Sequence, residues 1–171
     1  VETIEDFSPL AGLRLEKLYL YETHFTDPSI LREMPLEELN LVGVPIEDLS
    51  PLLEMPLKRL WINDTCVKDL SPLTQSTLVS VSFDGTEVSD LTPLTRLPAL
   101  ERVSMARTLV RDLSPLASVR LKRLVFTPGN IETGIEIVRE MDSLEEVGDS
   151  IENCRPPAAF WAKYDAGKFS E

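Results

Sequence analysis

The sequence predicts an α/β solenoid, in which copies of one short unit stack side by side and share a parallel β-sheet on the concave face. Two observations predict this fold. Similar segments recur along the chain 21 or 22 residues apart, and every copy opens with apolar residues at alternate positions. The copies begin at Leu15, Leu36, Leu57, Leu78, Leu100 and Leu121.

Each copy opens with the pattern L-x-x-L-x-L, as in LKRLWI from Leu57 to Ile62. Alternation places one set of side chains on each face of a strand, so the leucines point into the core. The pattern is that of the strand in a leucine-rich repeat. The inward pairs are Leu18 and Leu20, Leu39 and Leu41, Leu60 and Ile62, Val81 and Phe83, Val103 and Met105, and Leu124 and Phe126.

Two polar features follow each strand. A threonine recurs three residues after the second core position, where a hydroxyl can satisfy backbone groups that have left the sheet; these are Thr23, Thr65, Thr86 and Thr108. An Asp-apolar-Ser/Thr-Pro-Leu turn comes next, with its aspartate at Asp48, Asp69, Asp90 or Asp112. We expect the Ser or Thr to cap a short 3₁₀-helical turn on the convex face and the proline to be its first residue.

The C-terminal part departs from the repeat. Thr133 and Glu136 have capping-box spacing and predict a longer helix over IETGIEIVREM. A second helix, AAFWAKYDA, is expected between Pro157 and Gly167, with its aromatic side chains covering the end of the leucine column. The predicted organisation is a partial N-terminal repeat (1–14), an array of about six full units (15–147) and a C-terminal capping segment with a short helix (148–171).

Composition excludes several classes of function. The chain has 171 residues and a net charge of −12, which argues against nucleic-acid binding because that requires neutralised phosphates. It lacks the roughly 20 consecutive apolar residues that membrane insertion needs. The chain starts with Val1 inside a repeat, so we expect a piece of a longer protein. No signal peptide opens it, and the compartment stays open with the cytoplasm slightly favoured. We expect a monomer.

No motif predicts chemistry. His24 is the only histidine, and no Cys or His pair has metal-ligand spacing, so we expect no enzyme, metal or cofactor in this chain. A calcium ladder of the recurring aspartates is the alternative. It is disfavoured because each aspartate precedes a capping residue and a proline, and no glycine-rich calcium nonapeptide occurs.

The D-L-S-P-L turns at this spacing resemble bacterial leucine-rich repeats of the internalin type. Nearly the whole chain is also similar to the repeat tails that follow serine/threonine protein kinase domains in planctomycete-like bacteria, including the phrase LEEV and the closing segment PPAAFWAKYDAG. This resemblance implies a protein- or peptide-binding module of a larger signalling protein. Kinase signature motifs are absent from this sequence, so no phosphoryl transfer is assigned to it.

The outward strand positions are the candidate binding surface, since exposed Tyr, Trp and Arg are typical of interfaces. The aromatic candidates lie in the first three units, together with acidic residues, and basic candidates lie toward the other end. The predicted partner-binding residues are Tyr19, Tyr21, Trp61, Asn63, Asp64, Arg102, Arg107 and Arg123. The alternatives are that aromatic pairs merely stabilise the sheet, or that the array is a structural spacer, an assembly element or a surface adhesin.

Overall fold

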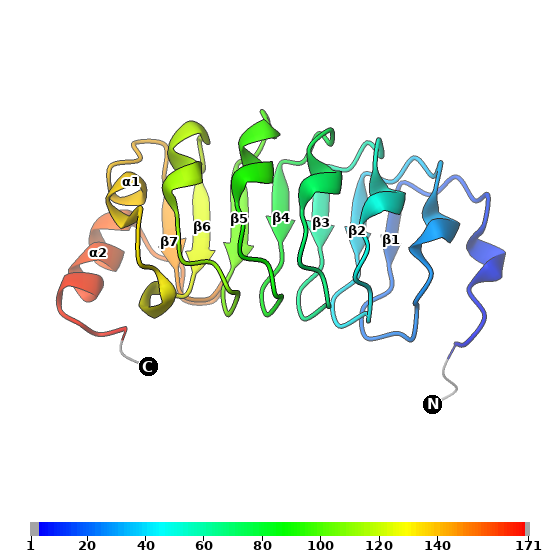
Figure 1. The fold of residues 1–171 in the computed structure, drawn as a ribbon, viewed down its shortest axis with the longest axis horizontal. Helices are drawn as coiled ribbons and strands as arrows, with labels where there is room; N and C mark the ends of the chain where they lie inside the picture. Colours follow the sequence, from blue (N-terminus) through cyan, green and yellow to red (C-terminus); the bar gives the residue numbers. More distant parts are fainter. Residues whose placement is uncertain (1–3, 170–171) are drawn as a thin grey trace.

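The computed structural model describes residues 4–169 and shows an arc of stacked coils (Figure 1). Seven parallel strands form one sheet in chain order. The connection after each strand leads to the strand of the next repeat, which lies beside it. Units that are neighbours in the sequence are therefore neighbours in the sheet. The strands are β1 (Lys17–Tyr19), β2 (Glu38–Asn40), β3 (Arg59–Trp61), β4 (Ser80–Ser82), β5 (Arg102–Met105), β6 (Arg123–Phe126) and β7 (Glu146–Gly148).

The register follows the repeat. Leu39 pairs with Leu18 on one side and with Leu60 on the other, and the pairing continues through Val81 and Val103. These inward residues are buried and form one continuous core along the array. Burial of each methylene stabilises the fold by about 0.8 kcal/mol. Because a strand of three or four residues covers little surface alone, this energy depends on stacking.

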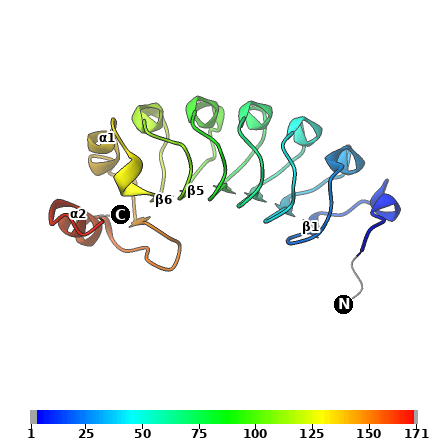
Figure 2. The same cartoon turned by 60° about the horizontal axis from the view of Figure 1, so that its bottom comes forward.

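Short 3₁₀-helical turns line the outer arc, while the strands lie on the inner one (Figure 2). This arrangement confirms the predicted α/β solenoid with a concave parallel sheet. The turns are η1 (Ser8–Leu10), η2 (Pro28–Leu31), η3 (Ser50–Leu52), η4 (Ser71–Leu73), η5 (Thr92–Arg96), η6 (Ser114–Ser118) and η7 (Pro128–Asn130).

In η1 to η6 an aspartate carboxylate satisfies an N-terminal amide of the turn, and the expectation that Ser or Thr would cap these turns is wrong. Ser50 is already the first residue of η3, and Pro51 is the second. The Asp48 carboxylate accepts a hydrogen bond from the Ser50 N–H at 2.7 Å. A carboxylate reaches the amide two residues ahead more readily than a serine hydroxyl does, which is the geometry of an Asx turn. The same bond recurs from Asp6, Asp27, Asp69, Asp90 and Asp112.

The threonines lie where the sequence predicts and hold the turns after β1, β3, β4 and β5. Thr65 Oγ1 donates to the Ile62 carbonyl at 2.8 Å, and Thr86 Oγ1 donates to the Phe83 carbonyl at 2.7 Å. Thr23 and Thr108 make the equivalent bonds to the carbonyls of Leu20 and Met105. Each hydroxyl therefore satisfies a carbonyl that has left the sheet.

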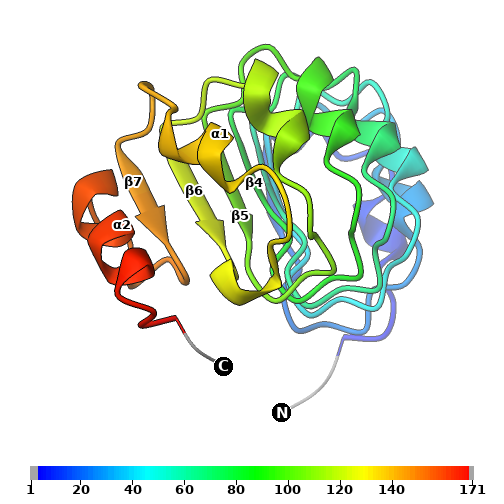
Figure 3. The ribbon, with the colours of Figure 1, turned by 60° about the vertical axis from the view of Figure 1, so that its left-hand side comes forward.

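Two short helices close the C-terminal end of the sheet (Figure 3). The helix α1 (Ile135–Arg139) is shorter than predicted, and no capping box forms. Thr133 donates its hydroxyl to Asp112 in the preceding coil, at 2.8 Å, while the left-handed Gly134 precedes the helix. Thr133 therefore links two coils. Within residues 4–169, no helix combines the length and apolar character that a membrane span requires.

The helix α2 (Pro157–Asp165) covers the end of the core, as predicted. Phe160 is fully buried, and its ring centroid lies 5.7 Å from that of Phe126. Arg139 of α1 lies over the Trp161 ring at 4.9 Å and forms an ion pair with Asp165 at 2.6 Å. These contacts fasten the two helices to each other and to the last strands.

Candidate functional site

The outward positions of the strands form columns across the concave face. In the column that leads each strand, Lys17 pairs with Glu38 and Glu38 with Arg59, and the pairing continues through Ser80, Arg102 and Arg123. In the next outward column, Asn40 pairs with Trp61 on the neighbouring strand. The sheet thus places residues from separate units side by side, at roughly 4.8 Å per strand.

Glu38 organises the N-terminal part of this face. Its carboxylate accepts a hydrogen bond from the Tyr19 hydroxyl at 2.7 Å and pairs with Lys17 at 2.9 Å and Arg59 at 2.7 Å. The Lys17 and Tyr19 hydrogen bonds lower the pKa of Glu38, and the bond to Glu38 raises the pKa of both donors. Tyr19 still exposes 50% of its surface, and Tyr21 exposes 58%. Both rings therefore present apolar surface to a partner.

A ladder of polar side chains holds the middle strands. Asn63 Oδ1 accepts from the Ser82 hydroxyl at 2.6 Å and from the Asp84 N–H at 3.0 Å. One unit further on, Asp84 accepts from the Ser104 hydroxyl and from the Ala106 N–H at 2.7 Å. Burial raises the pKa of Asp84, and these two hydrogen bonds oppose the rise. The Asn63 oxygen is therefore engaged in linking one unit to the next.

Asp64 and Arg107 lie at the edge of the sheet, where the strands end. Both adopt left-handed backbone conformations, with φ of 53° and 58°. Their side chains pair at 3.2 Å across Gly85 of the intervening unit. A Cβ at Gly85 would lie 2.2 Å from Asp64 Oδ1, so glycine keeps the path of this ion pair open. The pair consequently bridges two repeats instead of facing the centre of the sheet.

A hollow of about 470 Å³ lies over strands β3 to β6. Its polar wall contains Arg59, Arg102 and Arg123, and Trp61 contributes an aromatic ring. Ile151, 47% exposed, lines it from the segment after β7. That segment folds back because Val147 and Arg155 exchange backbone hydrogen bonds at 2.9 and 3.0 Å. The hollow is therefore formed by the sheet surface and by the segment 149–155, which we call the C-terminal lip.

The structure brings together only part of the predicted set. Trp61, Arg102 and Arg123 line the hollow. The other predicted residues do not line it: Tyr19 and Tyr21 belong to the N-terminal part of the face, Asn63 to the ladder, and Asp64 and Arg107 to the edge. The expected separation of an aromatic end from a basic end is thus incomplete, because Trp61 lies among arginines.

Three residues that shape the concave face were not among the residues predicted from the sequence. Arg59 is at an outward strand position in LKRLWI, one unit after Glu38, and this position was a readable signal. Glu38 is 92% buried, which is unusual for a residue predicted to point outward. Ile151 lies outside the repeat pattern, and only the fold of the lip brings it to the hollow. The outward residues Ser82, Ser104 and Val125 are also buried.

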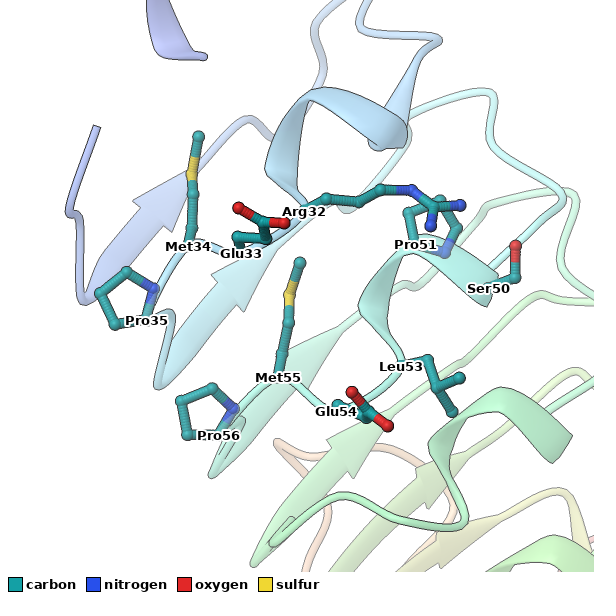
Figure 4. A pocket seen from close by; sticks show the side chains of 10 residues that line it. All are labelled: Arg32, Glu33, Met34, Pro35, Ser50, Pro51, Leu53, Glu54, Met55 and Pro56. Atoms are coloured by element: carbon teal, nitrogen blue, oxygen red, sulfur yellow. The ribbon is translucent and has the colours of Figure 1, made fainter. Parts of the chain in front are cut away.

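A second pocket, of about 500 Å³, lies between coils and not on the concave face (Figure 4). Met34 and Pro35 form one side of it, and Met55 and Pro56 form the other. These two sides are copies of the same Glu-Met-Pro turn. A related pocket separates the corresponding turns near Pro98 and Arg120. Because such pockets recur between stacked turns of the repeat, the concave hollow is the candidate site considered below.

The side chains of the hollow can bind and orient a partner. The Ser104 hydroxyl in its lining donates to the Asp84 carboxylate, and this bond belongs to the ladder that links the units. Within residues 4–169, no group of three or more His, Cys, Asp and Glu side chains could hold a metal ion. His24 is exposed, and the thiols of Cys66 and Cys154 form no disulfide. Guanidinium groups and an indole ring are instead typical of recognition surfaces.

Comparison with solved structures defines the class of the fold as a leucine-rich repeat of the internalin type. An internalin (inlF) from Listeria monocytogenes str. 4b F2365 matches with a TM-score of 0.72 and 26% identity, over 82% of this chain and 43% of that one. Internalin C2 (inlC2) of the same strain matches with a TM-score of 0.72 and 27% identity, over 84% and 64%. The chain therefore spans less than two thirds of either protein. No protein-family model and no curated protein matches it.

Proposed function

We propose that this chain is a non-catalytic protein-interaction module that recognises a partner protein or peptide through its concave sheet face. The exposed aromatic side chains on that face carry the proposal. Tyr19 and Tyr21 are each half-exposed or more, and Trp61 lies beside the hollow. Large aromatic side chains contribute disproportionately to binding energy when a partner covers them. The internalin-type fold supports the proposal, because it is generally a protein-binding module.

The test is partner capture by a pair of variants. Tyr19→Ala combined with Trp61→Ala should reduce capture from cell extract at least about tenfold, because each truncation at a hot spot typically costs more than 1 kcal/mol. The melting temperature should stay within a few degrees, since both side chains are partly exposed. Leu53→Ala is the control, because Leu53 is exposed between coils instead of on the sheet. Undiminished capture by the double variant would contradict the proposal.

We further propose that the chain belongs to a larger signalling protein, which has a kinase-like catalytic domain elsewhere in its sequence. This proposal rests on the likeness of the closing segment, from Pro156 to Gly167, to the tails of bacterial kinases. The full-length gene tests it. An upstream kinase domain would support it, while a signal peptide with a wall anchor would favour an adhesin.

The second candidate function is a spacer or assembly element that stacks with other copies through its exposed strand edge. The observation that favours it is that, among residues 4–169, no strand pairs with the outer edge of β1 at Lys17–Tyr19. We expect a monomer instead, because charged and polar side chains make such an edge a poor pairing site. Light scattering that shows dimers or filaments growing with concentration would favour assembly.

A further inference from the structure

We propose that the hollow over β3 to β6 binds an acidic segment of the partner polypeptide. In this arrangement, Asp or Glu carboxylates contact Arg59, Arg102 and Arg123, and an apolar side chain packs against Trp61 and Ile151. The inference rests on the proposed function, because it names the partner chemistry of the same concave face. It goes further by assigning a sign of charge and an apolar requirement to that partner.

Charge is the first argument. The chain as a whole carries −12, yet the residues that line this hollow include three arginines and, among the described residues, no carboxylate. Arg102 and Arg123 lie on the neighbouring strands β5 and β6, and Arg59 on β3 is separated from Arg102 by Ser80 of β4. Like charges placed this close repel one another. A carboxylate-bearing partner relieves the repulsion and makes charge-assisted hydrogen bonds.

The arginines have donors left for a ligand. Arg102 is held only at 3.8 Å from Glu101, whose other oxygen pairs with Lys122 at 2.7 Å. Arg59 uses Nη1 toward Glu38, and Arg123 uses Nε toward Glu146. A guanidinium has five N–H donors in a fork that matches a carboxylate, so each arginine can accommodate a second partner. The intramolecular carboxylates position these side chains without exhausting them.

Spacing indicates how an acidic segment would lie. Neighbouring strands are roughly 4.8 Å apart, so Arg59 and Arg102, on strands separated by one strand, are on the order of 10 Å apart at the backbone. An extended peptide running across the strands presents alternate side chains to one face roughly every 7 Å. Two acidic residues two positions apart would lie on the same face of the peptide and reach separate arginines. An apolar residue two positions before or after them lies on that face as well and would lie near Trp61.

The apolar surface gives selectivity beyond net charge. Trp61 is half-buried, and Ile151 exposes 47% of its surface into the hollow. Arginine side chains bind any polyanion through charge alone, whereas an indole ring and an isoleucine favour a ligand with its own apolar side chain. A simple polyanion should therefore bind less well than a mixed acidic and apolar peptide.

The test is fluorescence anisotropy with a fluorescein-labelled peptide in which Glu, Glu and Leu occupy alternate positions separated by Gly, so that all three face the hollow, and with its Glu-to-Gln counterpart. The acidic peptide should bind at least about tenfold more tightly than the Gln version, and its affinity should fall as salt rises. Arg102→Gln with Arg123→Gln should weaken binding about tenfold or more. Arg96→Gln with Arg120→Gln is the matched control, since both arginines are exposed, outside the hollow and without an ion pair among residues 4–169.

Three results would overturn the inference. They are no binding of the acidic peptide, equal binding of the Gln peptide, or equal loss in the two double variants. Circular dichroism and melting temperature establish that the Arg102→Gln, Arg123→Gln protein is folded, and Arg102→Gln alone serves if Arg123 proves necessary for folding. The Tyr19→Ala, Trp61→Ala protein distinguishes this failure from failure of the proposed function. If that protein loses partner capture while any of the three results is found, the concave face is the binding surface but does not prefer acidic segments.

Discussion

At the scale of single residues, the concave face contains side chains of two kinds. Asn63 and Asp84 use their oxygens to link consecutive units, so their polar character serves the scaffold. Trp61 and Arg102 make no comparable bond to the next unit's backbone, and both line the hollow. An outward position in the repeat therefore has no fixed role. The hydrogen bonds distinguish the two kinds of side chain where sequence could not.

Asp84→Asn should stabilise the protein at neutral pH. Burial raises the pKa of Asp84 above its ordinary value of 3.8, so the ionised carboxylate is less favourable in the folded chain than in the unfolded one. The cost is present in full above the folded-state pKa and disappears as pH falls below 3.8. Asn63 shows that an amide oxygen can make the equivalent bonds. We expect a melting temperature roughly 2 °C higher at pH 7.

Thermal melts of both proteins from pH 7 to pH 3 check this prediction. The difference between them should shrink as the pH decreases, because Asp84 becomes protonated and loses its charge. A lower melting temperature for Asp84→Asn at pH 7 would show that the ionised form contributes more than its burial costs.

Asp48→Ala should have the opposite pH dependence. The hydrogen bonds from Ser50 lower the pKa of Asp48, so its contribution is present above the ordinary value of 3.8 and is lost as pH falls through the lower folded-state value. We expect the loss of this cap to cost about 0.5–1 kcal/mol at pH 7, the lower part of the range for caps, because the site is exposed. Chemical denaturation measures the cost. Glu47→Ala removes the same charge one residue earlier and should be nearly neutral.

At the scale of elements, sequence predicts the strands well and the end of the array poorly. Each strand pairs one unit away, so the repeat itself specifies register, as for Leu39 and Leu60. Thr133 is an example at the end of the array. Its spacing to Glu136 predicts a bond within the same helix, but its hydroxyl donates to Asp112 in the preceding coil. Ile151 likewise reaches the hollow only through the backbone pairing of Val147 with Arg155. The periodicity of the sequence cannot predict such contacts, because they involve segments outside the repeat.

Phe160→Ala should uncouple the C-terminal cap. Phe160 is fully buried against Phe126 and Phe169, so its truncation leaves a cavity at the end of the core. We expect a loss of about 3–4 kcal/mol in the free energy of unfolding. Hydrogen exchange should accelerate in β6 and β7 before it does in β2 and β3, because each unit contacts mainly its neighbours.

Tyr164→Ala is the control for this prediction. Tyr164 lies on the same helix but is only partly buried, so its truncation should cost clearly less. Equal acceleration of exchange along the whole sheet in Phe160→Ala would show that the array unfolds as one unit and would contradict a local role for the cap.

At the scale of the whole molecule, repetition separates stability from recognition. The core column and the aspartate bonds recur in nearly every unit, the threonine bond recurs in four, and together they stabilise the arc. The concave side chains vary from unit to unit, so a single basic hollow can exist within a chain of net charge −12. Binding on this face can therefore change with little effect on the fold.

The most direct test of this account is site-specific photo-crosslinking in the full-length protein within its native cell. A photoreactive benzoylphenylalanine is introduced in place of Trp61 on the concave face and, separately, in place of Leu53 between coils. The account predicts a discrete partner adduct from position 61 and none from position 53. An adduct from position 53 with none from position 61 would place the partner on the other surface and contradict the central claim.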